Sequence, residues 1–581
     1  MHVSGAARTT ENPAPAGAAA RARGWRRIAA VAGTLVLLIV AFVVLPGWIP
    51  LLPRAVARRM TESFLRGVLL AYSALVLAGV IGAPVTAWLL VPSSRRGRRP
   101  SALVRIFLFC FSCLFSLAAL EIGSAAWRSW MHRLPVLPTS FPDPVPGEHR
   151  IVVLGGSSAM GEPFRPWLSV GQIVAWQLQR AVPTRRFELD ILAFLGDSLE
   201  QQHKKFSAIT KRPDAVIIYS GHNELTARFE ENRDYSLAEE PRLRLLQSAY
   251  RVSLHSPFCR LVYELVSRNR LDSPPLMNGR HQLIDRPLCS PRETAEVLAD
   301  FTARLEALVG YCERIGALPI LIVPPANEAD YEPSRSTLPP MVSRTERDRL
   351  VREFFEARGV EATNPALGQS LYAGILDRHP GFAEAHFRLG RLLQHAGLIA
   401  EARRHFSEAL ENEGLPNRCK RAFREVYRQV ATRHPECILI DGRDELMAAS
   451  PTGLLDNHLI EDTHHPNLKG QLVLAGAVLR ELQGRRTFGG SPRFSLPLDP
   501  LECCDHFELD EARLATACER TSVHYLRVSG YRYDPAERLE KSRRFAAAAR
   551  KLRAGSPRDE VGLPGLDFRR VAGVSGTSDD L

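Results

Sequence analysis

Short apolar runs, each followed by glycine or polar residues, recur along the middle of the chain. Uninterrupted runs of this kind are typical of strands that are buried on both faces of a parallel sheet. Between them lie stretches with apolar residues at helical spacing, including residues 291–315 and 468–482. This alternation predicts an α/β fold with a parallel sheet. The expected strands are residues 151–154, 187–194, 212–220, 317–325 and 436–441.

Longer apolar runs precede these elements. Residues 28–45 and 67–91 contain no charged residue, and they predict two membrane-spanning helices. A third run, residues 106–127, contains Glu121, so the sequence leaves open whether it also spans. A cleaved signal peptide fits poorly, because the apolar runs repeat and no small-residue cleavage site follows the first.

Charge supports a membrane partner rather than nucleic acid. The chain has a formal net charge of +12, and arginines cluster near its N-terminus. Five arginines precede the first apolar run and five lie between the second and third, whereas four lie in the first loop and two follow the third run. The positive-inside rule then predicts a cytoplasmic N-terminus. With three crossings the rest of the chain lies outside the cytoplasm, and with two crossings it faces the cytoplasm.

Composition divides the chain into five parts. A stretch with five prolines between residues 134 and 147 predicts a stiff linker after the membrane region. The C-terminal part predicts a helix that begins at Asp534-Pro535 and stops at Gly555, and we expect no chemistry there. The parts are a disordered basic arm (1–27), a membrane region with about three helices (28–127), a proline-rich linker (128–148), the α/β domain (149–484) and a helical tail (485–581).

Two helical insertions interrupt the expected α/β domain. The first, residues 225–290, predicts either a helix packed on the surface or a lid. The second covers about residues 345–430, and its segment 382–414 resembles one tetratricopeptide repeat, a helical hairpin of about 34 residues. Since about three repeats are needed for a stable array, this hairpin either packs on the domain or binds a protein partner. The resemblance rests on His386, Leu389, Gly390, Leu393, Ala402, Phe406 and Ala409.

Reactive side chains follow the expected strands. The first strand ends in Gly155-Gly156-Ser157-Ser158, and the third ends in Gly221-His222-Asn223-Glu224. Because chemistry collects beyond the carboxyl ends of parallel strands, Ser157 is well placed as a nucleophile. Asp462 and His465 are three residues apart, so the carboxylate can orient the imidazole as a base. The glycines do not fit a dinucleotide or phosphate loop, although a plain turn with a serine cap remains open.

This set of residues, in this order, resembles the SGNH or GDSL-type hydrolase family over about residues 150–483. The resemblance implies a three-layer α/β/α, flavodoxin-like domain with about five parallel strands. It implies catalysis without a metal or cofactor. It also implies roles for five residues, with Ser157 as nucleophile, Gly196 and Asn223 as oxyanion donors, and Asp462 with His465 as the base pair. Two positions depart from the family, which has aspartate where Gly156 and Glu224 stand here.

Other residues compete for these roles. Gly196-Asp197-Ser198-Leu199 spells the family's short name, but a Ser198 nucleophile would leave no separate glycine for the oxyanion after the second strand. Ser158 lies one residue after the position that matches the family's nucleophile, and it suits a helix cap. Only His465 lies three residues after Asp462 and is followed by a proline, so His464 is assigned to the turn. A metal site using His458 is conceivable, although no H-E-x-x-H or paired-cysteine pattern supports it.

These features predict a membrane-anchored serine esterase that acts on a carboxylic ester, either a lipid or an O-acylated glycan. An O-acyltransferase acting on an envelope polysaccharide would use the same residues. A third hypothesis is a catalytically silent scaffold that holds a partner through the 382–414 hairpin. We expect the bilayer and the ester as partners, no nucleic acid, and a catalytic domain outside the cytoplasm.

Overall fold

The computed structural model describes residues 101–226, 228, 251–268, 282–339, 342–415, 417–483, 485, 488 and 492–568. The basic arm and the first two expected spans lie outside these residues. The third expected span, residues 106–127, lies inside helix α4 (Ser101–Met131). Among the helices described, none is both long enough and apolar enough to cross a membrane. The chain divides into two compact units, one containing residues up to Arg128 together with 248–273 and the other containing the remainder.

In the first unit, polar contacts join α4 to helix α10 (Pro257–Arg268). The Glu121 carboxylate accepts hydrogen bonds from Ser256 Oγ at 2.6 Å and from Phe258 N at 3.1 Å. Arg128 Nη2 lies 3.3 Å from Glu264 Oε1. Glu121, the charged residue of the third apolar run, therefore stabilises the beginning of α10.

The second unit is built on a five-stranded parallel sheet with the order β2-β1-β3-β5-β7. This confirms the predicted parallel sheet. The second strand ends at Ile191, earlier than the expected residue 194. A separate two-stranded sheet, β4 (Ile284–Asp285) and β6 (Ser336–Thr337), was not predicted. The main strands are β1 (Glu148–Gly155), β2 (Arg186–Ile191), β3 (Ala215–Tyr219), β5 (Leu318–Val323) and β7 (Ile438–Asp441).

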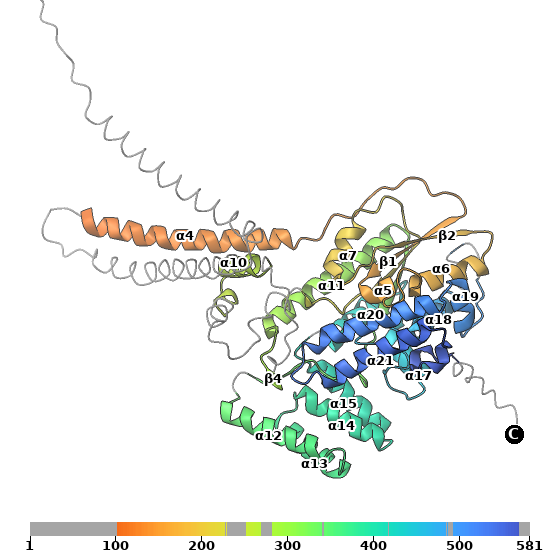
Figure 1. Ribbon diagram of the computed structural model, residues 1–581. Coiled ribbons are helices and arrows are strands. Elements are labelled where there is room, and N and C mark those ends of the chain that lie inside the picture. Colours follow the sequence, from red (N-terminus) through yellow and green to blue (C-terminus); the bar gives the residue numbers. More distant parts are fainter. Residues whose placement is uncertain are drawn as a thin grey trace, which may run out of the picture. The chain divides into compact units, whose positions relative to one another are not determined.

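Helices cover both faces of this sheet (Figure 1). Alternate side chains of each strand point to opposite faces, so Ile151 and Val153 enter one apolar cluster while Val152 and Leu154 enter the other. Burial on both faces explains why the strands read as continuous apolar runs. The first face is covered by α6 (Val170–Ala181) and α18 (Leu468–Leu482), and the second by α7 (Leu199–Phe206), α11 (Pro291–Arg314) and α16 (Arg421–Arg433).

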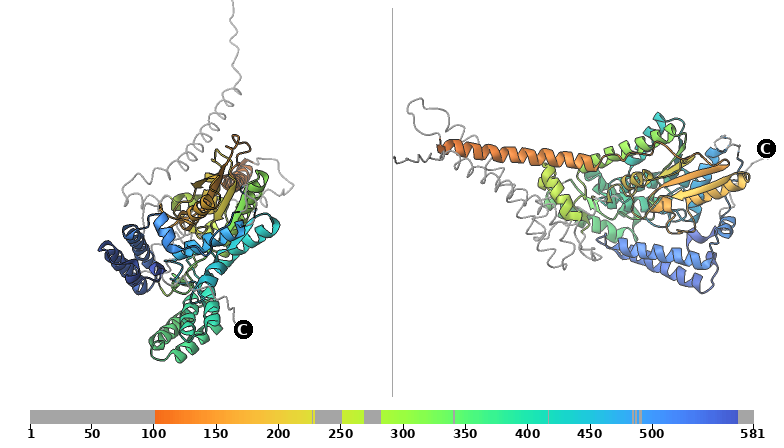
Figure 2. Two further views of the ribbon diagram at one scale, coloured as in Figure 1. Left: turned by 90° about the vertical axis from the view of Figure 1, so that its right-hand side faces the viewer. Right: turned by 90° about the horizontal axis from the view of Figure 1, so that it is seen from above.

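Four consecutive helices form a group beside the α/β core (Figure 1 and left view of Figure 2). The expected hairpin at residues 382–414 is present as α14 (Ala383–His395) and α15 (Ile399–Glu411). Its helices approach closely at Gly390, where an added Cβ would lie 2.8 Å from Phe406 Cε1. The preceding pair, α12 (Arg344–Val360) and α13 (Pro365–Arg378), lies in the expected helical insertion 345–430, although its individual helices were not predicted. The likeness of the hairpin to a tetratricopeptide repeat stays a prediction.

Helix α16 begins within the expected insertion 345–430 but packs on strands β5 and β7. Its buried face includes Phe423, Tyr427 and Val430, which belong to the apolar cluster on the second face of the sheet. We therefore assign α16 to the α/β core, where it precedes the last strand.

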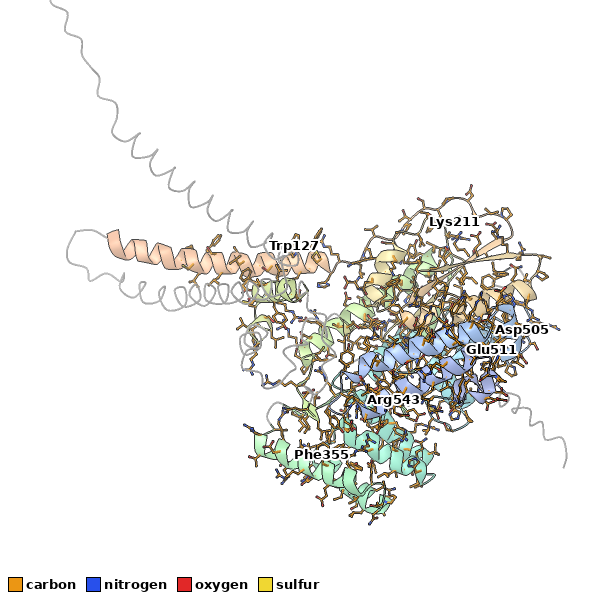
Figure 3. All side chains as sticks on the ribbon, in the orientation of Figure 1. Trp127, Lys211, Phe355, Asp505, Glu511 and Arg543 are labelled. Atoms are coloured by element: carbon orange, nitrogen blue, oxygen red, sulfur yellow. The ribbon has the colours of Figure 1, made fainter. Side chains whose placement is uncertain are left out.

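The C-terminal helices share the core of the α/β domain. They are α19 (Pro500–His506), α20 (Glu511–Ser529) and α21 (Ala536–Arg553), of which α20 and α21 lie side by side. Figure 3 labels Glu511 on α20 and Arg543 on α21. Leu514 and Phe545 belong to the same apolar cluster as Ile151. This segment was expected as a separate tail, and it instead completes one face of the core.

Candidate active site

The three neighbouring strands β2, β1 and β3 deliver the predicted residues to one edge of the sheet. Ser157 begins the short helix α5 (Ser157–Met160) directly after β1 and Gly156. Gly196 lies in the loop after β2, and Asn223 lies in the turn after β3. The carboxyl ends of parallel strands meet at a common edge, so the fold itself gathers these groups.

Ser157, His465 and Asp462 form an unbroken hydrogen-bonded series. His465 Nε2 lies 2.7 Å from Ser157 Oγ. On the other side of the ring, His465 Nδ1 lies 2.8 Å from Asp462 Oδ2 and 2.9 Å from Oδ1. All three side chains are buried. The structure therefore brings together the nucleophile and base pair that the sequence predicted.

The charge on Asp462 fixes the tautomer of His465. Burial by itself would raise the pKa of Asp462, but the adjacent His465 and His524 rings bring this pKa well below its usual value. The ionised carboxylate can only accept hydrogen bonds. The proton of neutral His465 therefore sits on Nδ1, and Nε2 is free to accept the proton of Ser157.

Asn223 lies against the turn that carries Ser157. A Cβ added at Gly156 would come within 2.5 Å of Asn223 Nδ2, so this glycine makes room for the amide. Asn223 Nδ2 also donates to Asp197 O at 3.2 Å. Gly196 has φ +79° and no atom within 4 Å of an added Cβ, which leaves open space beside its backbone. The close approach of Asn223 gives a physical reason for glycine at position 156.

A methyl group at position 156 should displace this amide. We expect Gly156→Ala to lower kcat by about a hundredfold, the usual cost of losing one oxyanion donor, while the protein remains folded. The measurement is steady-state ester hydrolysis with circular dichroism of the same samples. Gly374→Ala is the control, because an added Cβ at Gly374 meets no atom within 4 Å. Unchanged kcat in Gly156→Ala would show that Asn223 does not need this space.

The rival serines make other contacts. Ser198 is the N-cap of helix α7, where its backbone N–H and its Oγ donate to Gln201 Oε1 at 2.6 and 2.9 Å. Ser158 Oγ donates to His464 O at 3.0 Å. Neither hydroxyl is paired with a histidine ring nitrogen in these contacts. The geometry thus favours Ser157 as the nucleophile.

Glu224, where the family has aspartate, joins two of the loops. Its carboxylate accepts hydrogen bonds from Leu199 N at 3.2 Å and from Ser220 Oγ at 3.0 Å. Leu199 is the first residue of α7 and follows the Gly196 loop. Burial raises the pKa of Glu224 to about 7. The longer side chain therefore ties the Asn223 turn to the loop that carries Gly196.

Additional histidines surround the base pair. His222 stacks on His464 with ring centroids 4.2 Å apart, and His464 lies 4.4 Å from His465. Cys419 N donates to His222 Nδ1 at 3.1 Å. Burial lowers the pKa of His222 to about 3 and the pKa of His464 well below its usual value. Both rings are therefore neutral near pH 7. No spacing in the sequence predicted that they would stack.

These buried rings make the fold sensitive to acid. His222 binds a proton below about pH 6.5 in the unfolded chain but only near pH 3 in the folded chain. The unfolded state then holds more protons, so the free energy of unfolding falls as the pH drops from 6.5 toward 3. In His222→Asn the amide oxygen can still accept from Cys419 N. Between pH 6.5 and 5, we expect the free energy of unfolding to fall by roughly 1 to 2 kcal/mol less in this variant than in the wild type.

Urea unfolding at the two pH values measures this difference. His395→Asn is the control, because the His395 ring is exposed on α14. The buried carboxyls Glu224 and Glu461, whose pKa values burial raises to about 7 and about 8, act in the opposite direction. Comparing each variant with wild type largely cancels their contribution. Equal pH dependence in wild type and His222→Asn would contradict the prediction.

One residue beside the base pair comes from the C-terminal helices, where no chemistry was expected. His524 of α20 places Nε2 2.8 Å from Thr463 Oγ1 and 3.9 Å from Asp462 Oδ2. The expectation that this segment carries no part of the site is therefore corrected. A single histidine in a helical pattern has no spacing that signals such a role, and only the packing of α20 on the loop reveals it.

The spacing of Asp462, His465 and His524 is also one that could hold a metal ion, since their ligand atoms lie within 4.8 Å of one another. In the arrangement described, however, both ring nitrogens of His465 contact protein partners, Asp462 and Ser157. This geometry is that of a proton relay. His458, named in the alternative metal hypothesis, bonds Asp456 through Nδ1 at 3.0 Å.

The sequence matches no family model and no curated protein. The solved structures found in the structural comparison include the following two. A lipase/acylhydrolase from Enterococcus faecalis has 14% sequence identity and a TM-score of 0.26, with 60% of this chain and 100% of that chain covered. LAE5, an alpha/beta hydrolase enzyme from the metagenome of Lake Arreo, Spain, has 15% identity and a TM-score of 0.25, with 59% and 95% covered. Likenesses of this size assign neither a family nor an activity to the chain.

Proposed function

We propose that this protein is a serine hydrolase that cleaves a carboxylic ester. The observation that carries the proposal is the series Ser157 Oγ, His465 Nε2, His465 Nδ1 and Asp462 carboxylate, with contacts of 2.7 and 2.8 Å. An adjacent base raises the reactivity of a serine hydroxyl, which is a weak nucleophile by itself. A silent scaffold would have no need to keep this series aligned.

The reaction proceeds in two halves. His465 takes the proton of Ser157 as Oγ attacks the ester carbonyl carbon, and ionised Asp462 stabilises the imidazolium that forms. The backbone N–H groups of Ser157 and Gly196 and the amide of Asn223 meet the negative charge on the tetrahedral oxygen. His465 then returns the proton to the departing alcohol. Water, activated by the same ring, releases the acid from Ser157.

Apolar side chains at the site's edge favour an ester with an apolar acyl group. Phe194 and Leu195 are 55% and 41% exposed, and they directly precede Gly196. Apolar side chains that stay in water beside an oxyanion donor suit contact with an acyl chain. The location of the enzyme at a membrane, outside the cytoplasm, stays a prediction from residues 28–45 and 67–91 and from the arginine distribution.

The proposal is tested with the full-length chain in detergent micelles. The protein is treated with a fluorophosphonate probe, and the labelled residue is identified by mass spectrometry. In parallel, hydrolysis of p-nitrophenyl esters from acetyl to octanoyl is measured with and without a sugar whose hydroxyl groups can accept the acyl group. We expect labelling at Ser157 and release of free acid. Acyl transfer to the sugar in preference to water would instead identify an acyltransferase, and a folded protein without labelling would overturn the proposal.

A further inference from the structure

Helix α20 contacts both loops that carry the catalytic groups. Toward the Ser157 loop, Arg520 Nη1 donates to Pro163 O at 2.9 Å and also to Arg165 O. Toward the Asp462 loop, Tyr525 OH donates to Glu461 O at 3.4 Å. His524 lies between these contacts in the helix. The same helix therefore spans the two loops whose relative position sets the distance from Ser157 to His465.

We propose that His524 is a positioning residue for the Asp462–His465 pair and that helix α20 thereby completes the active site. The inference rests on the proposed function, because it assigns His524 a role in that same reaction. His524 does not contact Ser157 in this arrangement. It acts on the orientation of the carboxylate and of the catalytic ring.

The contacts of His524 determine which nitrogen carries its proton. Arg527 Nη2 lies 3.4 Å from His524 Nδ1, and a guanidinium can only donate. Nδ1 therefore accepts, so in the neutral ring the hydrogen is on Nε2. Burial lowers the pKa of His524 to about 4, which keeps the ring neutral near pH 7. Nε2–H then donates to Thr463 Oγ1 at 2.8 Å.

This hydrogen bond holds the residue that follows Asp462. Thr463 is further held by the bond from Asn327 N to Thr463 O, at 3.0 Å. The Nε2–H group of His524 is also 3.9 Å from Asp462 Oδ2, so the positive end of its dipole lies near the carboxylate. Both effects favour the ionised Asp462 in the orientation that faces His465.

The ring of His524 also limits the rotation of His465. The two rings meet edge to face, with centroids 5.6 Å apart and an interplanar angle of 82°. Side chains in a close-packed interior cannot rotate without displacing their neighbours. The ring of His524 therefore occupies space that His465 would need in order to turn away from Ser157.

Buried ion pairs hold the chain that directly follows α20, and Arg538 also donates to Val528 O of α20 at 2.7 Å. After the helix ends, Arg532 pairs with Glu384 of α14 at 3.1 Å, and Arg538 of α21 pairs with Glu332 at 3.2 Å. These charged side chains are almost fully buried. Buried charges tolerate little displacement, because separating them leaves an uncompensated charge. The position of His524 is thus set by the body of the domain and not by a free helix.

The test compares variants of the full-length chain with an ester substrate. We expect His524→Ala to lower kcat about ten- to a hundredfold with KM changed by less than about twofold, because misplacement by about 1 Å can cost this much. His524→Gln should recover most of the loss, since its amide N–H can reach Thr463. Thr463→Val should resemble His524→Ala, and the double variant should be no slower than either single variant.

Val523→Ala is the matched control, because Val523 is the preceding residue of α20 and is 65% exposed. A readout independent of turnover is the low-field proton resonance of His465 Nδ1–H. We expect this resonance to shift or broaden in His524→Ala and to stay unchanged in Val523→Ala. Wild-type kcat and an unshifted resonance in folded His524→Ala would overturn the inference. If the wild type hydrolyses no ester, the proposed function fails, and the resonance still decides whether His524 positions the pair.

Discussion

Replacement of Ser157 by alanine is expected to lower kcat for ester hydrolysis by at least about ten-thousandfold, because no acyl-enzyme can form without Oγ. The remaining rate would come only from substrate binding and the oxyanion donors. Fluorophosphonate labelling should disappear completely. Since the side chain is small and buried beside His465, the fold and the unfolding midpoint should change little.

Ser198→Ala and Ser158→Ala are the matched controls for this experiment. Ser198 is the N-cap of helix α7, so its loss should cost about 0.5 to 2 kcal/mol of stability and leave labelling intact. Ser158 donates to His464 O, so its loss should loosen the loop without removing the nucleophile. Labelling that is lost in Ser198→Ala and kept in Ser157→Ala would reverse our assignment of the two serines.

The positions of the proposed catalytic groups were predictable because strand ends are visible in the sequence. Ser157 and Asn223 each follow an apolar run, and the structure places both at the same edge of the sheet. The end of β2 was predicted less accurately. The apolar run continues past Ile191, but Phe194 and Leu195 leave the sheet and are exposed. An apolar pattern does not distinguish a strand from an apolar loop beside a site.

The contribution of the C-terminal helices could not be predicted in the same way. The helical spacing in α20 indicates which face is buried, but it does not indicate which element covers that face. His524 meets Thr463 across 61 positions of sequence. Likewise, the stacking of His222 on His464 joins two loops that are far apart in the chain. Such contacts depend on the packing of whole elements.

The place of helix α16 in the fold also could not be predicted from the sequence pattern alone. Its amphipathic pattern fits a helix of the insertion as well as a helix of the core. The structure decides between them, because Tyr427 OH bonds Ser220 O at 2.7 Å and accepts from Ser220 N at 3.0 Å. Ser220 directly follows β3 and precedes the turn with Asn223. A helix that the sequence placed outside the core therefore supports the turn that carries Asn223, the proposed oxyanion donor.

The second large effect is expected from Asp462→Asn. Asp462 Oδ1 accepts the backbone N–H groups of His464 and His465, both at 3.2 Å, and an asparagine oxygen would keep these bonds. The amide nitrogen would then stand where Oδ2 now lies, 2.8 Å from His465 Nδ1. This N–H group competes with the retained oxygen, which lies 2.9 Å from Nδ1, and favours the tautomer in which Nδ1 accepts and the ring proton is on Nε2. In that tautomer His465 cannot take the proton of Ser157.

We therefore expect Asp462→Asn to lower kcat about ten-thousandfold with the geometry nearly intact. Steady-state hydrolysis measures the loss, and fluorophosphonate labelling of Ser157 should slow in parallel, because it needs the same base. Asp456→Asn is the control, since Asp456 forms a similar contact with His458 at 3.0 Å outside the relay. That variant should keep most of its activity. If Asp462→Asn kept more than about a tenth of wild-type kcat, Asp462 would not set the tautomer of His465, and the base would have to be oriented by another group.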